Sequence, residues 1–138
     1  MKIGDVCERN AATVCANATL TEAAQLLRNS YMDVIVAIAS QVARPTVVGI
    51  VTYHQLLEAL KRGDDPGRMR VLDILDANPL VLSEEEEIED AIARLRTRGA
   101  KHAPVTGSGG TLRGAISMDR LLGCRAVTLK TLSNAVGR

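Results

Sequence analysis

The sequence predicts an α+β fold (an α/β roll) of two β–α–β–β–α halves, each a small sheet packed by helices, related by a pseudo-twofold axis. Ile3-Gly4-Asp5-Val6 matches Val71-Leu72-Asp73-Ile74 at an offset of 68 (71 − 3). Later in each half, Gly49-Ile50-Val51-Thr52 matches Gly114-Ala115-Ile116-Ser117 at an offset of 65 (114 − 49). Because a unit of about 60 residues is marginally stable alone, we expect the halves to share one core.

One amphipathic helix is predicted in each half, because apolar residues recur with the i, i+3, i+4, i+7 spacing of a helix with one buried face. The matching positions are Leu20, Ala23, Ala24 and Leu27 in the first half and Ile88, Ala91, Ile92 and Leu95 in the second. Thr19 with Glu22 forms a capping-box pattern at the start of the first helix. Ser83 with Glu86 has the same pattern, but the repeat places Glu87 opposite Thr19, so we expect the second helix to begin near Glu87.

A β-hairpin is predicted after each helix, from runs rich in β-branched residues that are separated by turn-forming residues. The predicted strands are residues 34–39, 47–52, 102–106 and 112–117. The first hairpin loop contains Arg44-Pro45 and the second contains the glycine-rich segment 107–110. Each hairpin leads into a short helix that carries Leu56-Leu57 or Leu121-Leu122.

The chain divides into four parts at these signals. We expect a first repeat over residues 1–62, a second repeat over 71–125 and a C-terminal tail over 126–138. Residues 63–70 between the repeats are rich in Gly, Asp and Pro, which is typical of a linker.

The composition excludes several classes of function. Seventeen basic and sixteen acidic residues leave a net charge of +1, and Phe and Trp are absent, so neither charge nor stacking rings favour nucleic acid. No apolar run is long enough to span a membrane, and the first residues lack the pattern of a signal peptide, so we expect a cytoplasmic protein. Cys7, Cys15 and Cys124 form no C-x-x-C pair, which predicts buried thiols rather than a zinc site or disulfides.

The order of these motifs resembles a tandem pair of cystathionine-β-synthase (CBS) domains, a Bateman module. The first repeat reads I-G-D-V, T-V, T-L-T-E-A-A, V-I-V-A and G-I-V-T-Y-H-Q-L-L, and the second reads V-L-D-I-L, L-V-L, E-I-E-D-A-I, H-A-P-V and G-A-I-S-M-D-R-L-L. The resemblance covers nearly the whole chain up to about Arg125. It implies an adenosine compound (AMP, ADP, ATP, S-adenosylmethionine or NAD) as a regulatory ligand, a homodimer, and an unknown regulated partner protein.

The resemblance also implies a binding motif that ends in Ser or Thr, two variable residues and an Asp that accepts hydrogen bonds from the ribose. Thr52 and Ser117 occupy the hydroxyl positions, but Gln55 and Arg120 replace the Asp, and Asp119 lies one residue early, about 100° away on a helix. Gln55 can still accept a hydrogen bond, whereas Arg120 can only donate, for example to a phosphate. We therefore expect at most one weak adenosine site per chain, with phosphates near the basic residues.

The remaining candidate ligand contacts each have a structural alternative. Lys101 and His102 are expected to hold a phosphate, or to be an exposed pair at the start of a strand. The hydroxyls of Thr52 and Ser117 are equally consistent with helix caps. Thr13 and Val14, matched by Val81 and Leu82, are expected to form the apolar and backbone wall against a purine, or to be simply core strand. Val34 and Pro104 are further candidate ligand contacts.

Two further segments invite other interpretations. The acidic run 84–87 could suggest a divalent metal, but carboxylates at the start of a helix are more typical of the helix dipole. The segment 107–111 lacks the Lys and the glycine spacing of a phosphate-binding loop, so we interpret it as a hairpin turn.

The sequence predicts a stand-alone regulatory module that senses an adenosine-type ligand and modulates a partner protein. The alternative is a ligand-free dimerisation or interaction module with decayed nucleotide sites. Catalysis is not expected, because two His and three scattered Cys form no nucleophile–base pair by spacing. No cofactor is expected to be required.

Overall fold

The computed structural model describes residues 1–30, 34–39 and 45–136, with side chains through residue 127. The elements in chain order are β1 (Thr13–Cys15), α1 (Leu20–Asn29), β2 (Val34–Ile38), β3 (Val47–Thr52), α2 (Tyr53–Lys61), β4 (Leu82–Ser83), α3 (Ile88–Arg98), β5 (His102–Thr106), β6 (Leu112–Ser117) and α4 (Met118–Val136). The predicted α+β fold of two equivalent halves is confirmed. Arg44, expected in the first hairpin loop, lies outside the described residues.

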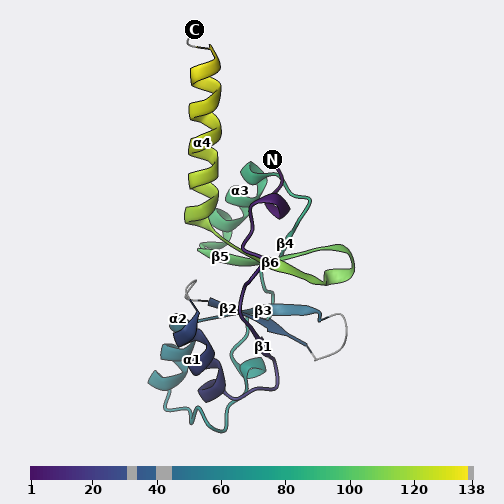
Figure 1. Cartoon of the computed structure of the whole chain (residues 1–138). Helices are drawn as coiled ribbons and strands as arrows, with labels where there is room; N and C mark the ends of the chain where they lie inside the picture. The colour runs from purple at the N-terminus through teal and green to yellow at the C-terminus, as the bar shows by residue number, and fades with distance from the viewer. Residues whose placement is uncertain (31–33, 40–44, 137–138) are drawn as a thin grey trace.

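Two three-stranded sheets lie in the middle of the molecule, with strand orders β1-β2-β3 and β4-β5-β6 (Figure 1). In each sheet the first strand runs parallel to the second, and the second pairs antiparallel with the third. Helices α1 and α2 cover one sheet, and α3 and α4 cover the other (Figure 1). The central strand of each sheet, β2 or β5, is buried almost along its whole length.

A small apolar cluster joins the two sheets. It contains the buried side chains of Val36, Ile38 and Ala115, with Ile50 and Leu112 packed against them. At one edge Thr46 forms an isolated bridge with Thr111, its own equivalent in the other repeat (111 − 65 = 46). A residue that pairs with its own counterpart lies on the symmetry axis, so the pseudo-twofold axis passes between these two threonines.

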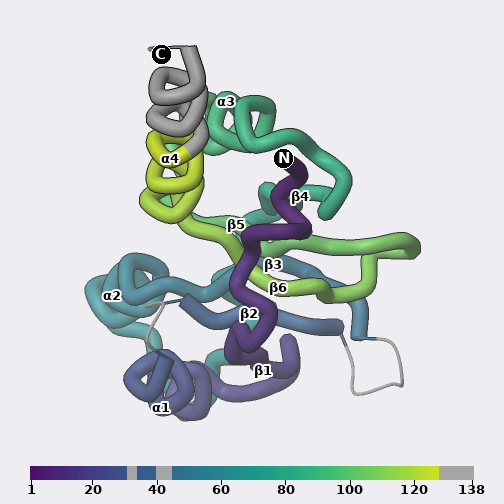
Figure 2. Tube along the Cα trace, turned by 45° about the horizontal axis from the view of Figure 1, so that its top comes forward, coloured from purple at the N-terminus to yellow at the C-terminus, as the bar shows by residue number. Residues whose placement is uncertain are grey.

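The leading segment of each repeat packs on the other repeat. The amide of Ile3 donates to the carbonyl of Glu86 at 2.9 Å, and the equivalent amide of Val71 donates to the carbonyl of Ala18 at 2.8 Å. Ile3 is buried in the core of the second repeat and Val71 in the core of the first. Figure 2 shows the first segment running from beside α3 across β6 to β1. Because each leading segment is buried in the core of the other repeat, two units that are marginally stable alone form one stable globule.

The helix starts follow local capping. The Thr19 hydroxyl accepts the Glu22 amide at 3.2 Å, and α3 begins after Glu87, as the repeat predicts. Helix α4 is longer than the short helix we expected: it continues through Gly123, and Thr128 stands at the position that matches Gly63, the glycine with a left-handed φ of 83° that follows α2. It therefore continues without a break into the segment that we separated as a tail. No described helix combines the length and apolarity needed to cross a bilayer.

Candidate functional site

A cleft opens between the two repeats, with a cavity of about 100 Å³. At roughly 10–15 Å³ for each water molecule, it has room for several waters or for part of a small ligand. Its walls come from β3 and α2 of the first repeat and from the segments flanking α3 in the second. We call it the Gln55 cleft; its lining residues are Ile50, Gln55, Asp76, Pro79, Leu80, Arg98, Ala100 and His102.

The first turn of α2 brings Gln55 to this cleft. The Thr52 hydroxyl accepts the Gln55 amide at 3.4 Å, and the Gln55 side-chain carbonyl accepts the Thr52 amide at 2.8 Å, which completes a capping box. The acceptor that we expected to meet a ribose is therefore engaged in the cap. Its side-chain NH₂ group remains the part of Gln55 that can donate to a ligand.

Three ionisable side chains of the second repeat line the same cleft. Arg98 ends α3, Asp76 lies in the segment before β4, and His102 begins β5. An Arg98 Nη2 donates to the carbonyl of Asn78 and lies 4.0 Å from Asp76 Oδ2. The cleft thus combines apolar walls with a few polar groups that converge on one space, which is the usual composition of a small-molecule site.

The equivalent residues of the second repeat lie elsewhere. The Ser117 hydroxyl accepts the Arg120 amide at 3.0 Å, so this serine caps α4 as Thr52 caps α2. The Arg120 side chain donates to the carbonyl of Val6 in the leading segment. Lys101 is exposed and its carbonyl accepts the Met118 amide at 2.8 Å. The basic cluster expected from Arg120, Lys101 and His102 is thus divided: among the cavities described, His102 lines the Gln55 cleft.

The other candidate ligand contacts are mostly core or strand residues. Val14 and Val34 are buried in the first sheet, and Pro104 is buried in β5 opposite Ala115. Thr13 is exposed at the start of β1, and Asp119 is exposed on the first turn of α4. Val34 pairs with Thr52, just as His102 pairs with Ser117, so these four residues lie at the strand ends from which α2 and α4 start.

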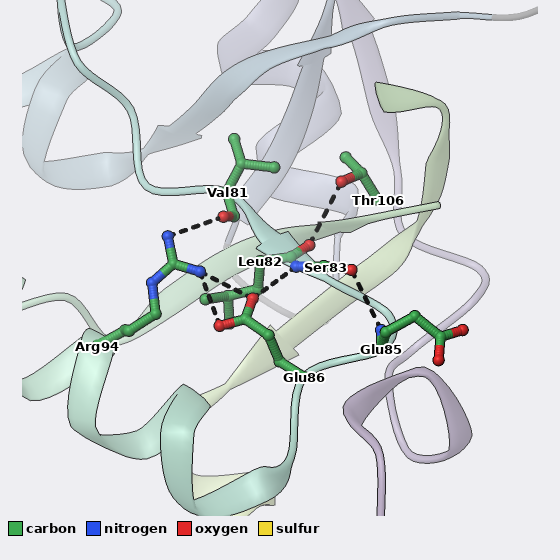
Figure 3. A network of polar contacts seen from close by, with 7 residues as sticks. All are labelled: Val81, Leu82, Ser83, Glu85, Glu86, Arg94 and Thr106. Atoms are coloured by element: carbon green, nitrogen blue, oxygen red, sulfur yellow. Dashed lines mark hydrogen bonds and ion pairs between the residues drawn. The ribbon is translucent and has the colours of Figure 1, made fainter. Parts of the chain in front are cut away.

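Val81 precedes β4 and is held by a polar network (Figure 3). Arg94 donates to both Glu86 carboxylate oxygens at 2.7 and 2.8 Å and to the Val81 carbonyl at 3.3 Å. The Ser83 amide in turn donates to Glu86 at 2.7 Å. This network positions the backbone at the entry to β4, so the Ser83–Glu86 pattern stabilises a loop and not a helix start.

The rest of the acidic run also has cationic partners. Glu84 pairs with Arg113 at 2.6 Å and Glu85 with Lys2 at 2.5 Å. The hydrogen bond that Lys2 donates to the Glu85 carboxylate raises the pKa of Lys2 above its ordinary value. In the part of the chain that the structure describes, no group of three His, Cys, Asp or Glu side chains is arranged to hold a metal ion.

Cys7 is buried against the core of the second repeat. Burial raises the pKa of the Cys7 thiol above its ordinary value, which disfavours the reactive thiolate. Cys15 and Cys124 are half-buried, and neither is in a disulfide with another described residue.

Sequence reasoning did not identify Arg98 and Asp76 as candidates. A position-by-position comparison of the repeats contains a signal, because Ser30 and Val34 stand where the second repeat has Arg98 and His102 (offset 68). A charge present in one repeat and absent from the other marks a position where the two clefts differ.

The family model of the CBS domain matches residues 3–62 and 71–126, the two repeats. An uncharacterized protein of Methanopyrus kandleri is 24% identical over 123 residues, which cover 88% of this chain and 61% of that protein. The chain therefore spans less than two thirds of that relative.

Two solved structures share the fold. A CBS domain protein of Pyrobaculum aerophilum complexed with AMP has a TM-score of 0.82 at 20% identity, covering 96% of this chain and 99% of that one. A CBS domain pair in complex with 5′-methylthioadenosine and S-adenosyl-L-methionine has a TM-score of 0.79 at 16% identity, covering 93% and 98%.

Proposed function

Because this chain belongs to the CBS domain family, we propose that it is a regulatory module that binds one adenosine-type ligand in the Gln55 cleft. The observation that carries the proposal is the cleft between the repeats, where apolar walls and convergent polar groups meet. Two proteins of the same fold are complexed with AMP or with 5′-methylthioadenosine and S-adenosyl-L-methionine, which supports this class of ligand.

The lining suggests how such a ligand would lie. Ile50, Pro79 and Leu80 offer an apolar wall for a flat purine ring. The Gln55 NH₂ group can donate to a ribose hydroxyl, in place of the carboxylate that accepts from it in the family motif. A neutral amide makes a weaker hydrogen bond than a carboxylate, so we expect modest affinity.

Helix α2 connects the cleft to the outer surface. Gln55 lies in its first turn, while Leu57 and Leu60 of the same helix are 55% and 54% exposed. Beside them an apolar cavity of about 220 Å³ lies between α1 and α2, with Leu20, Ala24 and Leu56 in its wall. We propose that this surface contacts a second copy of the chain or a regulated protein, and that ligand binding at Gln55 favours one position of α2.

A second candidate function is a constitutive dimerisation or interaction module with decayed nucleotide sites. It is favoured by two hydrogen bonds that engage the side chains at the motif's Asp positions: the Gln55 side-chain carbonyl accepts the Thr52 amide, and the Arg120 side chain donates to the Val6 carbonyl. In this case the same α1–α2 surface would bind its partner with no dependence on ligand.

A thermal-shift measurement with AMP, ATP, S-adenosylmethionine and NAD separates the two candidates. A compound present at 100 times its Kd adds about 2.7 kcal/mol to the free energy of unfolding. For a domain of this size that raises the melting temperature by on the order of 10 °C. The absence of a shift with all four compounds would favour the ligand-free module.

A matched pair of variants locates the binding. Ala100→Leu fills part of the Gln55 cleft and is expected to abolish the ligand-induced shift, measured against its own unliganded state. Ala93→Leu makes the same change on the exposed face of α3 and should leave the shift intact. A full shift in the Ala100→Leu variant would show that the ligand binds elsewhere.

A further inference from the structure

Helix α4 extends beyond the helix on which it packs. Its start lies beside the end of α3, where the Met118 amide donates to the Lys101 carbonyl at 2.8 Å. Arg125 Nε lies 3.1 Å from Oε1 of Glu89, the second residue of α3, so the two helices run antiparallel and α4 passes the start of α3 here. Residues 126–136 continue past α3 by about 16 Å, at the end of the molecule opposite to α1 and α2 (Figure 1).

The sequence of residues 126–136 favours a helix that packs on another surface. Leu129, Leu132 and Val136 have the i, i+3, i+7 spacing of one apolar stripe, in register with Leu122, which packs against the core of the second repeat. Propensity contributes little to a helix here, because many of the residues are of types that form helices poorly. These residues are Val127, Thr128, Thr131, Ser133, Asn134 and Val136.

An apolar surface that suits such a helix lies at the other end of the molecule. It is the cavity of about 220 Å³ between α1 and α2, which we call the α1–α2 groove. An engineered apolar cavity of about 150 Å³ holds a benzene molecule, so the groove has room for one or two leucine-sized side chains. Its lining residues include Leu20, Thr21, Ala24, Leu56, Leu60 and Asp64.

The equivalent place in the second repeat is bridged by charge. Leu60 and Thr21 correspond to Arg125 (60 + 65) and Glu89 (21 + 68), the ion pair between α4 and α3. In the first repeat the same two positions line the groove, and Leu60 is 54% exposed. The fold therefore presents the same pair of helices twice, and an open apolar groove remains in the first repeat where an ion pair joins the helices of the second.

Charge favours the α1–α2 groove over a second α4 as the surface that covers this helix. No acidic residue follows Asp119 in the sequence, whereas Lys130 lies within the extended part of α4. Two α4 helices paired with each other would bring together cations without a carboxylate between them. The groove instead has Asp64 in its wall, paired with Arg62 at 3.2 Å, and Glu22 is exposed on the first turn of α1.

We propose that residues 126–136 of α4 bind in the α1–α2 groove of a second copy of the chain, with Leu129, Leu132 and Val136 as the anchors. The α4 of the second copy binds in the groove of the first, so the two contacts are identical and the assembly closes as a twofold dimer. The groove and the extended part of α4 lie at opposite ends of one molecule, so the helix reaches another copy and not its own groove (Figure 1). The inference rests on the α1–α2 contact surface in the proposed function and names what covers it.

Disulfide cross-linking between two variants of the full chain tests this contact. Leu132→Cys is mixed with Ala24→Cys, which places a thiol in the groove wall, and one of the two variants carries a mass tag. After mild oxidation we expect the mixed dimer to be the main cross-linked product on a non-reducing gel. The matched control replaces Ala24→Cys with Ala93→Cys, on the exposed face of α3, and should give only the level of the wild-type mixture.

The other products identify the other ways to cover these surfaces. A Leu132→Cys homodimer as the main product would show that α4 pairs with α4, and an Ala24→Cys homodimer would show that the groove packs on another groove. Either result would overturn the proposed contact, and so would the wild-type level of cross-linking in every mixture.

Sedimentation equilibrium measures the strength of the contact. Leu132→Asp should raise the Kd of the dimer at least about 100-fold, since a buried leucine contributes a factor of about ten or more and each dimer contains the contact twice. Thr131→Asp adds the same charge away from the apolar stripe and should change the Kd by less than about fivefold. Equal effects of the two variants would contradict the apolar stripe as the contact.

The thermal shift with AMP, measured on the same variants, reports on the ligand site separately. Absence of the predicted cross-link together with an intact shift would overturn the contact between copies and leave the proposed ligand binding standing. The predicted cross-link without any shift would support the contact and count against the ligand site.

Discussion

Gly114→Ala tests whether the leading segment of the first repeat packs on the second repeat, because this segment contacts Gly114. Gly114 is buried in β6, directly beneath the chain at Glu8 and Arg9. The Glu8 amide donates to the Ala115 carbonyl at 2.8 Å, and the Ala115 amide donates to the Glu8 carbonyl at 3.0 Å. A Cβ at position 114 would lie 2.9 Å from the Glu8 carbonyl carbon and 3.2 Å from the Arg9 Cα.

These neighbours are backbone atoms, so they cannot move aside as the end of a side chain can. The leading segment would have to lift from β6 and lose both hydrogen bonds, at about 1 kcal/mol each. Ala115 is fully buried, and leaving its amide without a hydrogen-bond partner costs a further amount of about 1–3 kcal/mol. We subtract about 0.5–1 kcal/mol for the reduced entropy of the unfolded chain. The expected net loss is about 2–4 kcal/mol in the free energy of unfolding.

Urea unfolding followed by circular dichroism measures the change, and Gly123→Ala is the matched control. Gly123 is exposed in α4, and an added Cβ would have no neighbour within 4 Å. Alanine there should stabilise the chain by about 0.5–1 kcal/mol through helix propensity. Neutral surface substitutions change the free energy of unfolding by less than about 0.5 kcal/mol. A Gly114→Ala variant that differs from wild type by less than about this amount would refute the packing of the leading segment on β6.

Two predictions concern the second cleft and the assembly. Arg120→Asp places the family carboxylate beside Ser117 and should raise the calorimetric stoichiometry for adenosine above one per chain. We expect a gain of at least about tenfold in affinity at the new site. Unchanged or weaker binding would show that Arg120 is not what excludes the ligand. Sedimentation equilibrium at micromolar concentration should give twice the 14.7 kDa mass of one chain. Leu60→Asp, on the exposed face of α2, should reduce the measured mass to that of the monomer. A wild-type mass of 14.7 kDa would contradict the homodimer.

Much of the fold was predictable because its signals are local. The spacing of Leu20, Ala23, Ala24 and Leu27 predicts one buried face on α1. Leu20, Ala23 and Leu27 are buried in the structure, whereas Ala24 is exposed because it lies at the edge of that face, at the cavity between α1 and α2. The hairpin runs of both repeats coincide with β2, β3, β5 and β6 to within one residue. The cytoplasmic location stays a prediction.

The candidate site was predictable only in part. The motif placed Gln55 and His102 among the ligand contacts, and both line the cleft. Arg98 and Asp76 carry no motif, and they reach the cleft because of where α3 ends and how the segment before β4 lies against β3. The capping role of Gln55 and the contact of Arg120 with Val6 depend on side-chain conformations that spacing does not determine.

The sequence by itself determined the repeat, the elements of each half and the identity of the residues at the end of each hairpin. Only the tertiary structure decided which repeat receives each leading segment. Ile3-Gly4-Asp5 and Val71-Leu72-Asp73 carry the same pattern, so either segment satisfies the apolar site of either repeat. Periodicity describes one face of one element, whereas the partner of that face depends on hydrogen bonds between residues more than 50 positions apart, such as Val71 to Ala18. The position of Arg98 at the Gln55 cleft and the contact of Arg120 with the Val6 carbonyl depend on how the repeats pack, and so the difference between the two clefts appears only when the halves are packed together.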